Sequence, residues 1–146
     1  MAAAWPLIRD RVLSAVPPLL TGVTVWDGRV VTQAKPASWL TVGYQPSTDE
    51  DSAGSYEQSP SPVGGYAAEE TGTLLMEAGA RTGSTTTPDA FGIADAIHGW
   101  VDADQTLGGL LPQGSTASVA VQVVEAQQKA GAVQRLLITL TYFTRV

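Results

Sequence analysis

Hydrophobic residues recur at helical spacing in two segments of the chain. The first covers residues 5–16 and ends at Pro17. The second begins near Thr87, a residue type that caps helices, and continues with Pro88 in the first turn and Asp89 near the positive end of the helix dipole. Each helix is expected to place one apolar stripe on a core. The stripes consist of Trp5, Ile8, Val12, Leu13 and Val16 in the first helix and Ala90, Phe91, Ala94, Ile97, Trp100 and Val101 in the second.

Alternation of apolar and polar residues predicts strands in much of the remaining chain. The predicted strands cover residues 23–26, 29–31, 39–43, 69–80, 117–123 and 135–146, with a turn at Asp27-Gly28 between the first two and a hairpin connection at 127–131 between the last two. These elements predict an α+β fold: a mostly antiparallel sheet with two α-helices packed on one face and a C-terminal β-hairpin. At 146 residues, the chain has the length of a single domain.

One segment, residues 45–66, follows neither period. It is rich in Ser, Pro, Gly and acidic residues, a composition typical of irregular structure. Connections longer than about 15 residues are uncommon in compact domains and are usually functional. The sequence therefore predicts an irregular acidic loop at about residues 45–66, of a kind that can become ordered on a partner.

The chain is acidic, with 8 Lys and Arg against 14 Asp and Glu and a net charge of −6. Because nonspecific binding of duplex nucleic acid depends on clustered basic residues, this balance argues against a nucleic-acid-binding protein. No basic residue lies between Lys35 and Arg81. The candidate acidic surface in this span consists of Asp49, Glu50, Asp51, Glu57, Glu69 and Glu70.

Candidate catalytic chemistry is limited to one constellation. His98, the only histidine, has Asp95 three residues before it and Asp102 four residues after it, which places all three on one helix face. A His–Asp pair can orient a general base, but a solvated polar face explains the same residues, and we favour the solvated face. The chain has no cysteine and no serine in a nucleophile-elbow pattern. We therefore expect no catalytic residue and no cofactor.

A short acidic run begins like a calcium-binding loop. Asp49, Asp51 and Gly54 match positions one, three and six of such a loop. Ala53 does not fit position five, and Pro60 stands where the bidentate Glu is required. We therefore expect no metal site.

A compact turn follows the second predicted helix, and a Val-rich strand follows the turn. Residues 102–110 read Asp-Ala-Asp-Gln-Thr-Leu-Gly-Gly-Leu. In this turn and in the order of its elements, the chain resembles the tail terminator proteins of long-tailed (siphovirus-type) bacteriophages, notably those of actinobacterial hosts. Such proteins tend to have an acidic residue, Thr or Pro before Leu-Gly-Gly, and an apolar residue here. The matching positions are Asp104, Thr106, Leu107, Gly108, Gly109 and Leu110, and residues 39–44 resemble a second family segment before the variable loop.

The resemblance implies a structural protein of the virion, located in the tail or neck and assembled in the host cytoplasm. Tail terminators form a ring, here expected to be a hexamer, that caps the tail tube, ends tail polymerisation and provides the joint to the head-side connector. The implied partners are other copies of the chain, the tail tube protein and the connector or stopper protein, without a membrane. Duplex DNA would pass through without being bound specifically. Two alternatives stay open: another neck component, such as a head–tail stopper or adaptor, and a small ligand-binding or enzymatic α+β domain.

The resemblance also suggests roles for three regions. The strand with Tyr142, Phe143 and Arg145 is the candidate subunit contact, since ring closure can cover the free edge of an open sheet. The acidic span is either a solvated loop or a lining of the pore that repels phosphates. The turn at residues 104–109 is expected to fix the second helix against the closing hairpin, with Leu107 beneath it, and to carry no chemistry.

Overall fold

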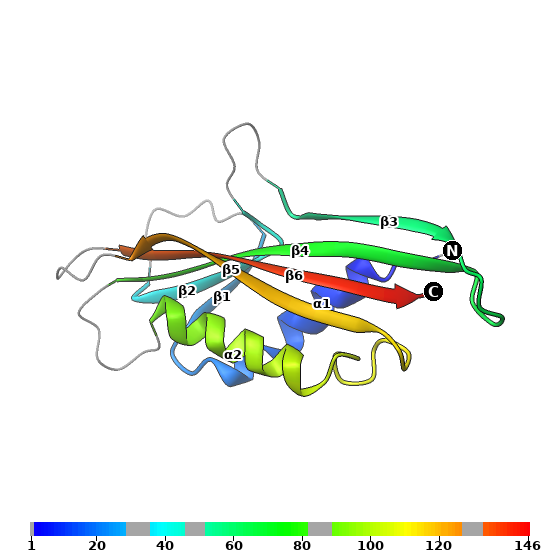
Figure 1. Cartoon of the computed structure of the whole chain (residues 1–146). Helices are drawn as coiled ribbons and strands as arrows, with labels where there is room; N and C mark the ends of the chain where they lie inside the picture. Colours follow the sequence, from blue (N-terminus) through cyan, green and yellow to red (C-terminus); the bar gives the residue numbers. More distant parts are fainter. Residues whose placement is uncertain (1, 29–35, 46–51, 82–88, 127–132) are drawn as a thin grey trace.

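The fold is organised around one long central strand, β4 (Ala68–Arg81), and carries its helices on one side of the sheet (Figure 1). The computed structural model describes residues 2–28, 36–45, 52–81, 89–126 and 133–146. In chain order the other elements are α1 (Trp5–Ala15), the 3₁₀ helix η1 (Pro17–Leu19), β1 (Thr24–Asp27), β2 (Ser38–Val42), β3 (Gly54–Pro60), α2 (Ala90–Ala103), β5 (Thr116–Ala126) and β6 (Val133–Arg145). This content confirms the predicted α+β class.

The six strands form one sheet in the order β1-β2-β4-β6-β5, with β3 also paired to β4. On one side, β4 pairs with β3 through its first half and with β2 through its second half. On its other side, β4 pairs with β6 along its whole length. All these pairs are antiparallel, and so is β5 with β6, which confirms the predicted C-terminal hairpin. The hairpin connection at residues 127–131 lies outside the described residues.

The strand before the predicted Asp27-Gly28 turn pairs with β2. Asp27-Gly28 predicted a turn into a strand at residues 29–31, and residues 29–31 lie outside the described part of the chain. The strand before the turn, β1, pairs in parallel with β2. Gly28 follows it with a φ of +79° and donates its N–H to the carbonyl of Val42 at 2.8 Å. A left-handed glycine thus ends β1.

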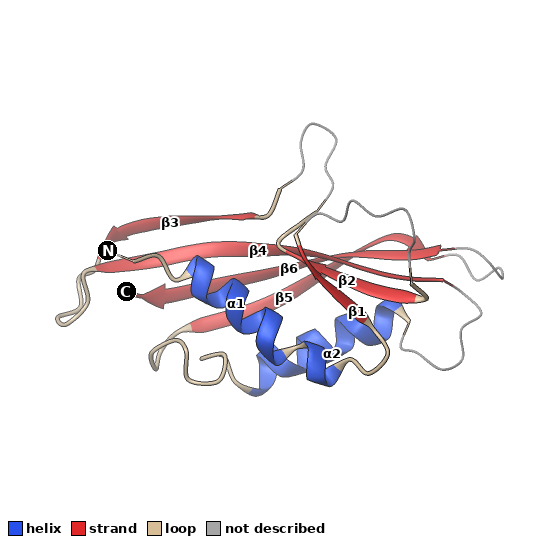
Figure 2. Cartoon of the chain, turned by 180° about the vertical axis from the view of Figure 1, so that it is seen from behind, coloured by secondary structure: helices blue, strands red, loops and turns tan. Residues whose placement is uncertain are grey.

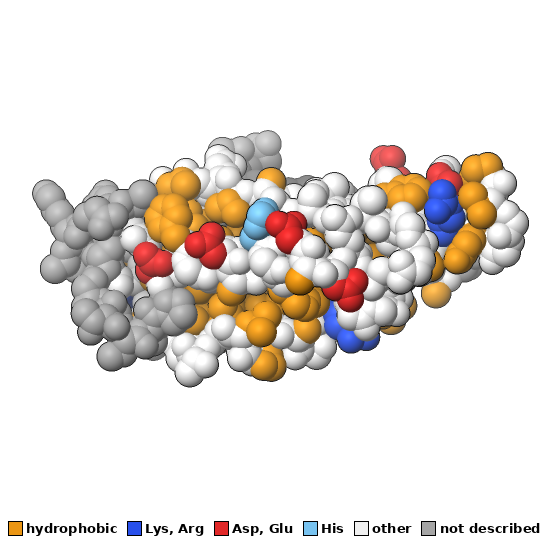
Figure 3. Space-filling model, turned by 60° about the horizontal axis from the view of Figure 1, so that its bottom comes forward, with side chains coloured by type: hydrophobic (Ala, Val, Ile, Leu, Met, Phe, Trp, Pro, Cys, Tyr) orange, Lys and Arg blue, Asp and Glu red, His pale blue; other side chains and the backbone are white. Residues whose placement is uncertain are grey.

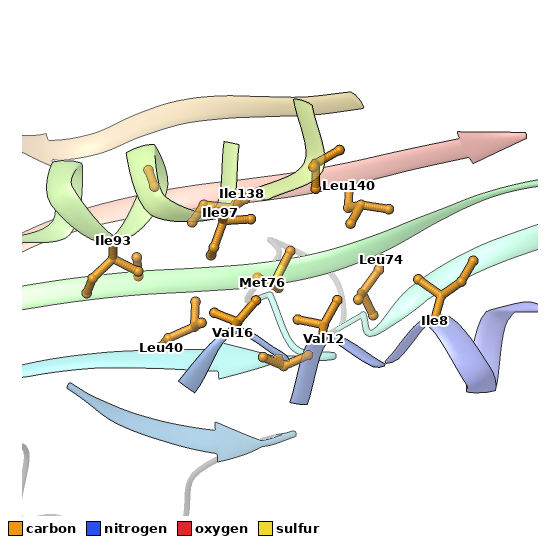
Figure 4. Packing of buried hydrophobic residues seen from close by; sticks show 14 of the residues in the cluster. Ile8, Val12, Val16, Leu40, Leu74, Met76, Ile93, Ile97, Ile138 and Leu140 are labelled. Carbon is orange, nitrogen blue, oxygen red and sulfur yellow. The ribbon is translucent and has the colours of Figure 1, made fainter. Parts of the chain in front are cut away.

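Both helices pack on the same face of the sheet, as predicted (Figures 1 and 2). Burial alternates strictly along most of β6, because every second side chain points at the helices. The side chains that meet in this layer are fully buried, and they include Ile8, Val12, Val16, Leu40, Leu74, Met76, Ile93, Ile97, Ile138 and Leu140 (Figure 4). Burying one side chain of this size stabilises the fold by roughly 1.5–3 kcal/mol. The core therefore fixes the helix layer to one face of the sheet.

The start of α2 differs from the predicted start. The helix begins at Ala90, and Asp89 is its N-cap, with a carboxylate that accepts a hydrogen bond from the N–H of Gly92 at 2.8 Å. The predicted cap at Thr87 is wrong, and Thr87 and Pro88 themselves lie outside the described residues. Asp caps a helix at least as well as Thr, and its charge also complements the helix dipole.

The apolar stripe of α2 also differs from the predicted stripe at one position. Most of the predicted stripe is buried, including Ile97 and Val101, but Phe91 is 38% exposed. Ile93 takes a core position instead. Residue 93 lies one helical turn before residue 97, whereas residue 91 falls on the rim of the stripe.

The segment predicted to be an irregular loop contains a strand. Gly54–Pro60 forms β3 and pairs antiparallel with β4, so the prediction is wrong for these residues. Every residue of β3 after Gly54 is exposed. A strand without a buried face shows no alternation of apolar and polar residues, which is why the sequence pattern did not reveal it.

Candidate assembly surfaces

The turn after α2 is closed by one carboxylate and one hydroxyl group. Asp104 accepts hydrogen bonds from the N–H and the hydroxyl of Thr106, at 2.9 and 2.5 Å, and from the N–H of Gly108 at 3.2 Å. The Thr106 hydroxyl accepts the N–H of Gly109 at 3.1 Å. These bonds, first among them the one from the Thr106 hydroxyl, lower the pKa of Asp104. The turn therefore satisfies its own polar groups and holds its carboxylate ionised.

Leu107 connects the same turn to the core. It is fully buried and has a left-handed φ of +54°, while Gly108 and Gly109 have φ values of +75° and +83°. The left-handed conformation costs a residue with a side chain roughly 1–2 kcal/mol, so the burial of Leu107 must offset that cost. The expected position of Leu107 beneath the turn is confirmed. The turn fixes the exit of α2 toward β5.

A buried carboxylate joins four parts of the fold. Glu70, in β4, has no exposed surface. It accepts hydrogen bonds from the Tyr142 hydroxyl at 2.6 Å and from the Gln58 side-chain amide at 2.7 Å. Its two oxygens also lie 3.0 and 3.1 Å from the backbone nitrogen of Ala4, the N-cap residue of α1. Glu70 therefore ties α1, β3 and β6 to β4, at the end of α1 where the helix dipole favours negative charge.

The assignment of Glu70 to an acidic surface is therefore wrong. Glu70 lies an even number of residues from Leu74 and Met76 along β4, so its side chain points to the helix side of the sheet. Gly72 lies between Glu70 and Leu74, and a Cβ atom at Gly72 would be 2.6 Å from the Tyr142 hydroxyl oxygen. Burial, followed by the hydrogen bond to Glu70, raises the pKa of Tyr142, which keeps the phenol as a donor. The alternation along β4 is the sequence signal that could have placed Glu70 in the core.

The remaining acidic residues of the span do not form one continuous patch in the described part of the chain. Glu57 is exposed on β3. Glu69 is partly buried and lies 3.5 Å from the guanidinium of Arg145. Glu77 is buried and forms an ion pair with Arg135 at 3.0 Å. Asp49, Glu50 and Asp51 lie outside the described residues. The charge of the span is therefore partly neutralised within the sheet.

The C-terminal strand β6 does not offer the free edge that was predicted. It pairs with β4 from Val133 to Arg145 and with β5 as far as Phe143. Tyr142 is buried, and the Arg145 guanidinium lies 5.3 Å from the centroid of the Phe143 ring. The expectation of a free edge is wrong for β6 as far as Phe143, because β4 and β5 pair with its two sides, and the subunit contact through this strand stays a prediction. The exposed edge on this side belongs to β5.

Short hydroxyl side chains occupy part of the sheet face opposite the helices. Ser55, Thr73 and Thr141 are cross-strand neighbours on β3, β4 and β6, and the Ser55 and Thr73 hydroxyls are 3.4 Å apart. A cavity of about 330 Å³ opens here, lined by Ser55, Tyr56, Glu57, Thr71, Gly72, Thr73 and Thr141. Glu57 is the only carboxylate in this lining. The lining carries hydroxyl groups and one carboxylate, but it does not bring together the groups that acid–base or nucleophilic catalysis requires.

The single histidine lies on the solvent side of α2. His98 Nδ1 is 3.2 Å from an Asp102 carboxylate oxygen, and both side chains are more than half exposed. Asp95 is exposed on the same helix face, and Figure 3 shows the histidine in a row with acidic side chains. This is the arrangement expected for a solvated polar face. No group of three or more His, Cys, Asp and Glu side chains suited to a metal ion occurs among the described residues.

Comparison with known proteins gives no assignment for these surfaces. No protein-family model matches the chain. No curated protein sequence matches it either. In the described ranges of the structure, no helix combines the length and apolar character that crossing a membrane requires.

Proposed function

We propose that this protein is a structural component of a bacteriophage virion, located at the neck of a long-tailed phage and assembled in the host cytoplasm. In this proposal, copies of the chain form a ring, most simply a hexamer, on the end of the tail tube. The ring stops tail polymerisation and presents a joint to the head-side connector. The proposed role is structural and involves no catalytic residue and no cofactor.

One arrangement carries the proposal. The turn at residues 104–109, which resembles that of tail terminators, lies between α2 and β5 and fixes the helix layer against an open sheet. Among the described strands, none pairs with the outer side of β5 or of β3. Free strand edges present unpaired N–H and C=O groups, and ring closure between copies is one way to cover them.

Charge supports a ring through which duplex DNA passes without being bound specifically. The chain has a net charge of −6 and only 8 basic residues. Two of these, Arg135 and Arg145, lie beside Glu77 and Glu69. Because phosphate binding depends on clusters of unpaired Lys and Arg, such a surface favours the passage of duplex DNA rather than its binding.

The proposal is tested by native mass spectrometry and negative-stain electron microscopy of the purified protein, alone and mixed with the tail tube protein encoded in the same genome. We expect a species of six times the 15.2 kDa chain mass and six-fold rings. An absence of rings both in isolation and on tubes would refute the proposal. Catalytic turnover that is lost in a His98→Ala variant would instead support the enzymatic alternative.

A further inference from the structure

In the described part of the chain, the strand β5 lies at an edge of the sheet. It is paired on one side, with β6, and no other described strand pairs with its outer side. The sequence from Thr116 to Val124 contains no charged residue and no proline. Proteins usually block edge pairing with charges, prolines or short strands. In β5, only the irregularity between Val123 and Glu125 interrupts the edge. An edge of this kind is suited to pairing with another strand.

Apolar side chains are exposed beside this edge. Val121 is 42% exposed, Val123 is 51% exposed and Val124 is 42% exposed. Val121 is the cross-strand partner of the core residue Ile138, so it points to the helix side of the sheet, and Val123 follows it on that side. We call the edge of β5 together with these three valines and Phe91 the β5 surface.

Phe91 extends the β5 surface onto the helix layer. The N–H of Ala90 donates to the side-chain oxygen of Gln134 at 3.3 Å, and Gln134 is the cross-strand partner of Ala126. The first turn of α2 therefore lies at the C-terminal end of β5. Phe91 is on this turn and is 38% exposed. Exposed apolar side chains that adjoin a free strand edge are typical of a protein contact.

Among the described strands, β1 and β3 also have no partner on their outer sides at the opposite edge, and the strand directions relate the two edges. Successive strands in the order β5, β6, β4 and β3 are all antiparallel. Because β2 is antiparallel to β4 and β1 is parallel to β2, β1 runs in the same direction as β3. Both strands of the opposite edge therefore run against β5. A second copy related by rotation about an axis along the strands would present β3 or β1 antiparallel to β5.

We propose that the β5 surface binds the β1/β3 edge of a second copy of this chain. The contact continues the antiparallel sheet from one subunit to the next, with the helices on the same side throughout. It joins two different surfaces, so repetition closes a ring or extends as a filament. The choice of this head-to-tail contact over a symmetric β5–β5 pair rests on the proposed ring function.

A photo-crosslinking experiment identifies the occupant of the β5 surface. The chain has no cysteine, so Val123→Cys introduces a unique thiol that can carry a benzophenone maleimide. After irradiation, the covalent dimer is isolated on a denaturing gel and its crosslinked peptides are sequenced. We expect crosslinks to residues 24–27 or 54–60 of the other copy. Crosslinks to residues 116–126 would show a symmetric contact and overturn the proposal, and so would the absence of any covalent dimer at about 1 mM protein.

A charge substitution tests the same contact without a label. Val123→Asp places a carboxylate in the contact, and we expect self-association to weaken by more than about tenfold. Leu7→Asp is the control for the added charge, because Leu7 is 52% exposed on α1 and does not belong to the β5 surface. Equal self-association of wild type and Val123→Asp would overturn the inference. Wild-type rings that fail to cap tail tubes would refute the proposed function and leave the contact intact.

Discussion

Glu70 and Asp104 are two carboxylates that both accept backbone N–H groups near the end of a helix, yet they do so in opposite ways. The partners of Asp104 lie two to four residues away, and Asp104 is exposed. The partners of Glu70 lie 12, 66 and 72 residues away, and Glu70 is fully buried. One carboxylate shapes a local turn, whereas the other holds distant segments together.

The two carboxylates also stabilise the two opposite edges of the sheet within one subunit. Glu70 holds β3 and the start of α1 against the central strands. The Asp104 turn fixes α2 beside β5. A local motif and a long-range cluster therefore position the two edges that we propose to meet between subunits.

The largest expected effect is at Glu70. Glu70→Ala removes the acceptor of Ala4, Gln58 and Tyr142 and leaves the buried donors of Ala4 and Tyr142 unsatisfied, so we expect the free energy of unfolding to fall by about 3–5 kcal/mol. Urea denaturation measures this change. Glu57→Ala, at an exposed site on β3, is the control and should change stability by less than about 0.5 kcal/mol. Similar effects of the two substitutions would contradict the structural role of Glu70.

A smaller loss is expected at Leu107, the buried residue of the Asp104 turn. Leu107→Ala deletes a fully buried side chain, which should lower the free energy of unfolding by about 2–4 kcal/mol. Leu19→Ala, at a residue that is 51% exposed on η1, is the comparison and should have little effect. Equal midpoints of urea unfolding for both variants would show that Leu107 does not anchor the turn.

Alanine substitutions at two glycines distinguish the effect of backbone conformation on stability from the effect of packing. A Cβ atom would meet nothing within 4 Å at Gly109 or at Gly99, but Gly109 has a φ of +83° and Gly99 lies within α2. Gly109→Ala should therefore destabilise the protein by about 1–2 kcal/mol, whereas Gly99→Ala should stabilise it by up to about 1 kcal/mol. Thermal unfolding distinguishes the two signs. A stabilising Gly109→Ala would contradict the left-handed turn.

The smallest expected effect is the pH dependence from Asp104. Its pKa is lower in the folded state than its usual value near 4, so its contribution to stability is present above about pH 4 and is lost as the pH falls through the folded-state pKa. Asp104→Asn should therefore differ from the wild type at neutral pH and approach it at low pH. A stability difference that stays constant from neutral to low pH would contradict the assigned role of this carboxylate.

Local patterns predicted local structure well and long-range partners poorly. The spacing of Val12, Ile97 and Leu140 predicted the helices, the last strand and the face on which they meet, because burial repeats with the period of each element. The role of Leu107 followed from the adjacent glycines. The acidic character of Glu70 predicted exposure, whereas the alternation along β4 places it on the buried face, where its hydrogen-bond partners come from distant parts of the sequence. The strand β3 was missed because its side chains are exposed and show no alternation.

The sequence pattern predicted the wrong edge strand for a related reason: β5, not β6, lies at the edge of the sheet. Alternation identifies β5 and β6 equally well as strands, but strand order depends on pairing between distant residues. The long β4 occupies the free side of β6 and leaves β5 at the edge. The proposed subunit surface therefore moves from Tyr142, Phe143 and Arg145 to the neighbouring strand.

The proposed function requires that this chain ends a growing tail tube. The most direct measurement adds the purified protein to polymerising tail tube protein from the same genome and records tube lengths and tube ends by electron microscopy. We predict shorter tubes of uniform end structure with a ring of this protein at one end, and we predict that Val123→Asp forms this cap less well. Tubes of unchanged length with no added ring would contradict the claim.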